Sequence, residues 1–320
     1  MKKQLGNVLK VLISVGLLLL VFRLVDPKEA LAVLGGANPW LFALAVLLFQ
    51  ATQVIRAYRW RALLRAVDVA VPVHRLIYLY YVGTFFNTFL PSGFGGDAVK
   101  MYELNRYSQR GSESVGTVLV DRLIGLVALF ALGLVAWPFV SVALPRMEAW
   151  FLLAVCVVGL AGTWLLFQKQ IIDRLLRVLP GKFGVTLTRL YNAVHACGTG
   201  GLWWALGFSV LFYFVLFAMT YVTGLALGVR LPFLYFAGLM PVISLSMMIP
   251  SIGALGTREG AYVLAFARTG LTSAANAIAM SLGFYLINVL TGMVGAVLYA
   301  IDAIGAMRER RLAETDKGGS

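Results

Sequence analysis

The sequence predicts an all-α polytopic membrane protein with about six spanning helices and two re-entrant hairpins of broken helix, related as an inverted repeat. Composition is the first observation: 60% of the 320 residues are hydrophobic and only 13% are charged, and the mean hydropathy is +0.86. Ordinary soluble domains carry about 25% charged residues. Most of this chain must therefore lie in lipid, and we expect a multi-pass protein of the cell's cytoplasmic (inner) membrane.

Apolar runs long enough to cross a bilayer supply the spans. They cover roughly residues 8–25, 39–55, 115–140, 150–167, 202–227 and 275–300. The first run is similar to a secretory signal, but Arg23, Asp26 and Lys28 place charge in the cleavage region, which indicates a retained span. We expect one membrane domain over residues 1–311 and a disordered cytoplasmic tail over 312–320.

Two further apolar segments, 76–90 and 232–249, each run into a Pro-Ser break rich in glycine. The first continues as LPSGFGGDAVK over residues 90–100, and the second as IPSIGALGTREG over residues 249–260. Open backbone is tolerated inside a bilayer only where protein buries it or a wet cavity receives it. A helix that restarts there presents free N–H groups and a positive dipole end, which attract anions.

Loop charge sets the expected topology. The net charge is +13, from 27 Lys and Arg against 14 Asp and Glu, and most of the basic residues fall in segments that the positive-inside rule places in the cytoplasm. Both termini are then cytoplasmic. The same rule predicts that the hairpin over residues 76–108 enters from the cytoplasm and the hairpin over 232–268 from outside. Opposed hairpins of this kind form transporter sites near the midplane.

The first break supplies six candidate site residues, which are Asn87, Ser92, Gly95, Gly96, Asp97 and Lys100. Asp97 is interpreted either as the N-cap of the helix that begins at Ala98 or as a coupling-ion site, and both roles stay open. Lys100 lies one turn further on, where it can pair with Asp97 or face a phosphate. Asn87 is expected to satisfy backbone groups freed at the break.

The second break supplies Ser251, Gly256, Arg258 and Glu259, with Thr257 as the expected N-cap. Glu259 suits the positive helix end, and a local pair with Arg258 is one interpretation. A cation at that end is unfavourable without an anion nearby. This favours Arg258 as an anion ligand or as the partner of a distant carboxylate.

Asp121 and Arg122 are secondary candidates, expected as an interfacial pair where the third span begins. The two histidines, His74 and His195, lack metal spacing, and the two cysteines, Cys156 and Cys197, form no CxxC motif. We therefore expect no metal and no cofactor.

The motif Asn87-x-x-Leu90-Pro91-x-Gly93-x-Gly95-Gly96-Asp97-x-x-Lys100, with Pro250-x-x-Gly253-x-x-Gly256-x-Arg258-Glu259-Gly260 later, resembles the lysylphosphatidylglycerol synthase transmembrane family. This family comprises the flippase-like membrane regions of bacterial multiple-peptide-resistance proteins and their stand-alone relatives. The similarity covers nearly the whole chain, and we expect a stand-alone member without the soluble aminoacyl-transferring domain. The family often carries Arg where this chain has Lys100, so a bidentate phosphate contact is not expected there. The resemblance implies lipid translocation without lipid synthesis.

The expected function is a flippase that moves an anionic, phosphate-bearing lipid headgroup through a cavity between the two breaks. A membrane scaffold and an enzyme acting on lipid phosphates are the alternatives. The sequence has no D-x-D pair, no T-V-G-Y-G filter and no G-x-x-x-x-G-K-[ST] motif, which weakens the enzyme, channel and nucleotide-driven classes. Expected partners are membrane lipids and no nucleic acid, with a homo-oligomer or a lipid-synthesising enzyme left open.

Overall fold

The computed structural model describes residues 27–89, 95–108, 111–165, 191–249 and 256–317, together with residues 168, 174, 188 and 254. Within these ranges the protein is helical and contains no strand, as the composition predicts. The helices are α2 (Pro27–Gly35), α3 (Pro39–Ala66), α4 (Val73–Phe89), α5 (Gly95–Ser108), α6 (Gly111–Val140), α7 (Arg146–Leu165), α10 (Gly198–Ala226), α11 (Phe233–Ser246), α12 (Thr257–Tyr262), the π-helical turn η2 (Val263–Ala267) and α13 (Ala274–Lys317).

Five of the described helices are long and apolar enough to cross a membrane. They are Pro39–Ala66, Gly116–Val140, Arg146–Leu165, Gly198–Ala226 and Ala274–Asp302, and they correspond to five of the predicted spans. The sixth, over residues 8–25, lies outside the described residues. Residues 312–317 are helical, in contrast to the disorder expected there from the sequence.

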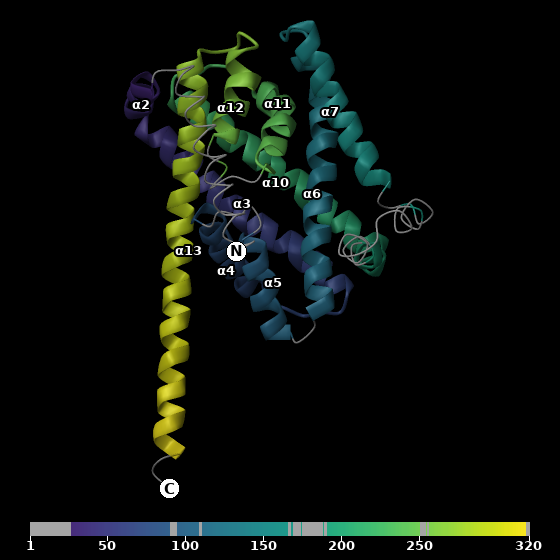
Figure 1. The fold of residues 1–320 in the computed structure, drawn as a ribbon, viewed down its shortest axis with the longest axis vertical. Coiled ribbons are helices and arrows are strands. Elements are labelled where there is room, and N and C mark those ends of the chain that lie inside the picture. Colours follow the sequence, from purple (N-terminus) through teal and green to yellow (C-terminus); the bar gives the residue numbers. More distant parts are fainter. Residues whose placement is uncertain are drawn as a thin grey trace, which may run out of the picture.

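The two breaks are present as interruptions between helices. The first separates α4 from α5, and the second separates α11 from the short α12 and η2. In Figure 1, α4 and α5 lie lower in the view than α11 and α12, which are near the top. This placement agrees with hairpins that enter from opposite faces, and re-entrance into a bilayer stays a prediction.

Helix packing holds each hairpin against a different part of the bundle. The helix α3 packs along α10, α4 packs along α13, and α11 packs against α6 and α7 (Figure 1). The largest buried cluster joins side chains of α6, α10, α11, η2 and α13, such as Phe217, Phe236 and Phe266. A second cluster around Trp60 and Tyr80 lies where α3, α4 and α5 meet.

Glycine permits the closest of these approaches. A Cβ on Gly295 of α13 would lie 2.1 Å from the carbonyl oxygen of Tyr81 in α4, and a Cβ on Gly96 would lie 2.0 Å from that of Gly83. Real Cβ atoms do not approach backbone this closely. The α13–α4 and α5–α4 contacts therefore require these two glycines.

Replacing Gly295 tests the α13–α4 contact. We expect Gly295→Ala to destabilise the protein by about 1–3 kcal/mol or more, because the added methyl group overpacks the helix interface. Gly162→Ala is the matched control, since a Cβ there meets nothing within 4 Å. Thermal unfolding in detergent measures both, and equal midpoints would contradict the packing described here.

Cysteine labelling tests re-entrance. Burial raises the pKa of the Cys197 thiol to about 11, and Cys156 is also buried, so the native thiols should react slowly with a maleimide. We expect Ala70→Cys, which precedes the first hairpin, and Tyr107→Cys, at its end, to react with an impermeant maleimide only from the cytoplasm. Arg230→Cys and Ser273→Cys, which flank the second, should react only from outside. Labelling of Ala70→Cys and Tyr107→Cys from opposite faces would rule out a first re-entrant hairpin.

Candidate functional site

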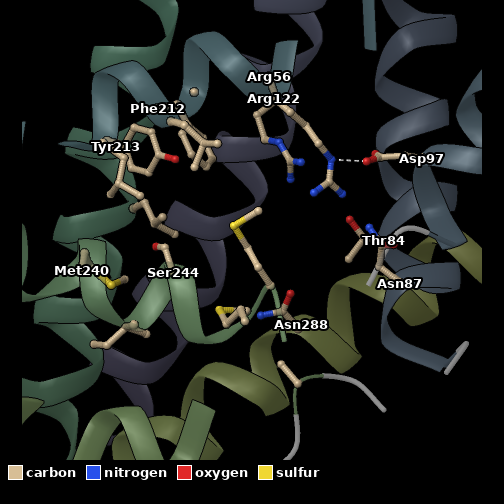
Figure 2. Close-up of a pocket in the computed structure, with 18 of the residues that line it drawn as sticks. Arg56, Thr84, Asn87, Asp97, Arg122, Phe212, Tyr213, Met240, Ser244 and Asn288 are labelled. Atoms are coloured by element: carbon tan, nitrogen blue, oxygen red, sulfur yellow. Dashed lines mark hydrogen bonds and ion pairs between the residues drawn. The ribbon is translucent and has the colours of Figure 1, made fainter. Parts of the chain in front are cut away.

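A cavity of about 520 Å³ lies where the two breaks meet the core of the bundle. The first break and its helices contribute Asn87, Asp97 and Lys100 to its wall, and the second contributes Ala254 and Arg258. Figure 2 shows Arg56 and Arg122 extending toward the cavity at one edge, with Asp97, Thr84 and Asn87 beside them and Met240 and Ser244 across from them. The prediction that residues of both breaks converge is therefore met by Asn87, Asp97, Lys100 and Arg258.

The start of α5 is capped from the neighbouring helix. The amide N–H of Gly96 donates to the Asn87 Oδ1 at 2.7 Å, which confirms that Asn87 satisfies backbone freed at the break. The prediction that Asp97 is the N-cap is wrong, because α5 begins at Gly95 and Asp97 lies inside its first turn. Gly96 lets the first turn of α5 lie against Gly83 of α4, within reach of the Asn87 side chain.

The Asp97 carboxylate is shared by two cations. Its Oδ1 lies 2.7 Å from the Lys100 Nζ, and its Oδ2 accepts a hydrogen bond from the Arg122 Nε. Asp97 and Lys100 are 4% and 3% exposed, and the Lys100 ammonium also lies 4.4 Å from the centre of the Tyr80 ring. The sequence left two roles open for Lys100, and the structure shows the first of them, the ion pair with Asp97. The Asp97 carboxylate thus joins α5 to α6 through two cations.

Asp121 forms a second buried ion pair, with Arg59 of α3. The Arg59 Nε and Nη2 donate to its two oxygens at 2.6 and 2.7 Å. The Tyr80 hydroxyl donates to Oδ2 at 2.9 Å, and Arg59 Nη1 donates to the Ser209 Oγ at 3.2 Å. The Asp121 carboxylate thus accepts hydrogen bonds from both α3 and α4.

The predicted interfacial pair of Asp121 and Arg122 is wrong. Asp121 is 3% exposed and pairs with Arg59, while Arg122 pairs with Asp97. The helix α6 already begins at Gly111, so both residues lie well inside it. Adjacent residues on a helix do not face each other, and the two side chains reach different neighbouring helices.

Arg56 is a cavity cation that the sequence did not single out. It lines the cavity, and its guanidinium lies 4.7 Å from the centre of the Tyr80 ring and 5.6 Å from that of Phe212. In the part of the chain that the structure describes, no carboxylate lies within salt-bridge distance of it. The positive-inside rule assigns Arg56 and Arg59 to a cytoplasmic segment, although their spacing of three residues places them on one helical face.

The second break is closed by its own acidic residue. The N–H of Gly256, which has a φ of +83°, donates to the Glu259 Oε2 at 2.6 Å, so Gly256 is the N-cap and α12 begins at Thr257. The Arg258 Nη2 donates to the Glu259 Oε1 at 2.6 Å. Ser281 of α13 accepts from the Arg258 Nε at 2.9 Å and donates to the same carboxylate oxygen at 3.0 Å.

The sequence favoured an anion or a distant carboxylate as the partner of Arg258, but the structure pairs it with its neighbour Glu259. The hydrogen bond from the Gly256 N–H holds Glu259 beside the helix end, where its carboxylate compensates both the dipole and Arg258. Ser92 and Ser251 lie outside the described residues. In the described ranges no group of three or more His, Cys, Asp or Glu side chains is arranged to hold a metal ion.

A family model of the lysylphosphatidylglycerol synthase transmembrane region matches residues 7–295. The chain belongs to this family. It is also similar to two UPF0104 membrane proteins of Methanothermobacter thermautotrophicus. One is 25% identical over 90% of this chain and 94% of the relative, and the other is 24% identical over 85% and 87%.

A UPF0104 membrane protein of Pyrococcus horikoshii is 26% identical over 40% of this chain and 39% of its own length. No solved structure matches the chain. The match over residues 7–295 takes in both breaks and every helix that lines the cavity, apart from the end of α13.

Removing the Asp121 charge tests the buried pair. We expect Asp121→Asn to destabilise the protein by about 3–5 kcal/mol, because Arg59 is then left buried without a counter-charge. Asp302→Asn is the control: its carboxylate also meets an arginine, Arg75, at 3.5 Å, but its side chain is 49% exposed. Exposed pairs contribute about 1 kcal/mol or less. Thermal unfolding midpoints in detergent compare the two variants. If Asp121→Asn lowers the midpoint no more than Asp302→Asn does, the buried pair is contradicted.

Proposed function

We propose that this protein is a lipid transporter that moves an anionic, phosphate-bearing headgroup across the membrane through the cavity between the two breaks. The observation that carries the proposal is the charge of the cavity wall. Its cationic lining residues in the described chain are Arg56, Arg59, Lys100, Arg122 and Arg258. The acidic lining residues there are Asp97 and Asp121.

Such a wall is costly to maintain inside a membrane bundle. Ionisable side chains at membrane depth are rare and mark pathways for ions and substrates. Arginine suits phosphate oxygens because its planar guanidinium donates two parallel hydrogen bonds. An anionic headgroup entering this cavity would gain those bonds and balance the excess positive charge.

The rest of the wall supports an amphipathic cargo. Leucine, phenylalanine and methionine side chains cover it away from the cations, including Leu129, Phe284, Met240 and Met247. Methionine adapts its shape to different apolar surfaces. A phosphate held by the cations could therefore lie next to apolar lipid, with acyl or prenyl tails remaining in the bilayer.

The proposed movement is a rocking of one hairpin against the other. The cavity lies between α4–α5 and α11–α12, and transporters with opposed broken helices expose a fixed site to each face in turn. We propose an orientation in the inner membrane with both termini cytoplasmic, and an activity of transport without covalent chemistry. The family is named after the transmembrane region of lysylphosphatidylglycerol synthase. This name agrees with membrane lipids as the proposed cargo.

Reconstitution tests the function. Purified protein in liposomes that carry a fluorescent anionic phospholipid should expose inner-leaflet lipid to an impermeant quencher faster than protein-free liposomes do. We expect Asp97→Asn to lower the rate about tenfold or more, since it releases Lys100 and Arg122 from the geometry that a shared carboxylate fixes.

Arg146→Gln is the control for that variant, because Arg146 is exposed at the start of α7 and lies outside the cavity wall. It should match the wild-type rate. Wild-type protein that leaves lipid accessibility unchanged over a panel of anionic lipids would contradict the transport function. Transport that is equal in the wild type and in Asp97→Asn would instead contradict the assignment of this cavity.

A further inference from the structure

We propose that Arg56 binds the phosphate oxygens of the headgroup directly, and that Tyr80 is the positioning residue that holds the Arg56 guanidinium in place. This inference rests on the proposed function and adds the residue that contacts the ligand. It follows from which hydrogen-bond donors of the cavity wall the protein already engages, and it does not depend on the net charge of the cavity.

Four cations of the cavity wall pair with carboxylates of the protein itself. The pairs are Arg59 with Asp121, Lys100 with Asp97, Arg122 with Asp97, and Arg258 with Glu259. In the first and the last of these pairs the guanidinium also donates to a serine hydroxyl. A bond given up to a ligand would leave a buried carboxylate without its partner, which is unfavourable. Part of the donor set of each of these cations is therefore already committed.

Arg56 is the cation of the wall whose donors stay open. Among the described residues, no carboxylate lies within salt-bridge distance of its guanidinium and no side-chain hydrogen bond engages it. None of its nitrogens belongs to the buried polar atoms that lack a partner in this part of the chain, so they remain accessible. Arg56 lines the cavity, and Figure 2 shows its side chain directed toward it. A ligand there can reach its donors without breaking an existing contact.

Two aromatic rings hold the Arg56 guanidinium. Its central carbon lies 4.7 Å from the centre of the Tyr80 ring and 5.6 Å from that of Phe212. A guanidinium over a ring is attracted through the flat face of the group. Its N–H donors lie in the plane of the group and are not consumed by such a contact. The rings therefore restrain Arg56 and leave its planar fork available.

Tyr80 is itself fixed in the core. It is 2% exposed, its hydroxyl donates to the Asp121 Oδ2 at 2.9 Å, and its ring makes an edge contact with Trp60 at 5.9 Å. The Lys100 ammonium also lies 4.4 Å from the centre of the ring. Tyr80 is not among the described residues that line the cavity. It can therefore orient Arg56 without touching the ligand.

A free guanidinium fork suits a phosphate group. Arginine binds phosphate oxygens through two parallel N–H···O bonds, whereas lysine presents a point charge that cannot reproduce this geometry. The phosphate could belong to a lipid headgroup or be a free ion, and apolar lining residues such as Leu129 and Met240 favour the lipid. Arg56→Lys is the informative variant, because it keeps the charge and removes the fork.

Titration calorimetry on the purified protein in detergent, with dioctanoyl phosphatidylglycerol as the ligand, tests the contact. We expect Arg56→Lys to bind about tenfold more weakly than the wild type, and Arg56→Gln at least as weakly, because a charge-assisted hydrogen bond contributes about this factor. Arg65→Gln is the matched control, on the same helix but exposed and outside the described cavity wall, and it should bind as the wild type does. Wild-type affinity in Arg56→Lys would overturn the inference. If Arg56→Gln fails to fold, Arg56→Lys still decides.

A double-mutant cycle tests the positioning role of Tyr80. Tyr80→Leu removes the ring and should weaken binding about threefold to tenfold, the contribution of a cation–π contact. Tyr80→Phe keeps the ring and should weaken binding less. In the Arg56→Gln background, Tyr80→Leu should have no further effect, because the residue that it positions is gone. Additive effects of the two substitutions would overturn the positioning role.

Two further measurements separate the possible outcomes. The wild type should bind dioctanoyl phosphatidylglycerol more tightly than inorganic phosphate, because the apolar wall also contributes. Equal or tighter binding of inorganic phosphate would overturn a lipid as the ligand. In liposomes where the wild type transports lipid, transport by Arg56→Lys at the wild-type rate would refute this inference and leave the transport function standing. Binding that depends on Arg56, without any transport by the wild type, would do the reverse.

Discussion

The Asp97 carboxylate is the contact on which the arrangement of the site depends. It lies in the first turn of α5 and joins Lys100 of the same helix to Arg122 of α6. Charged groups removed from water are stable only when they are matched and hydrogen-bonded. Each such match fixes a pair of helices: Arg59 with Asp121 joins α3 to α6, and Arg258 and Glu259 reach Ser281 of α13. The requirement to compensate charge thus fixes α5 and α3 against α6, and α12 against α13, around one cavity.

The two breaks have different chemistry although their sequences look alike. At the second, Glu259 supplies the cap and the counter-charge from within the same turn, so that end is neutral. At the first, the cap is the neutral amide oxygen of Asn87, and the one carboxylate of the turn is divided between two cations. Similar sequences at the two breaks thus lead to different charge environments, and the second break is tied to α13 through Ser281.

Features that depend on local sequence were predictable. The apolar runs located the five described spans, and Pro and Gly located both interruptions. The side-chain partners were not predictable because they come from other helices. Asn87 caps α5 across the break, and Asp121 meets an arginine 62 residues away in sequence. Arg56 and Arg59 were hidden by a rule that interprets basic clusters as cytoplasmic loops, whereas α3 continues through both to Ala66. The helical spacing of the two arginines was the signal available to correct that interpretation.

The close contact at Gly295 has a mechanical consequence. Because the backbones of α13 and α4 touch there, a movement of α4 toward α13 would displace α13. The helix α13 continues without interruption to Lys317, well past the end of its apolar span at Asp302. Gly295 lies near the middle of α13, so a displacement of the first hairpin at this contact would be passed to both halves of the helix.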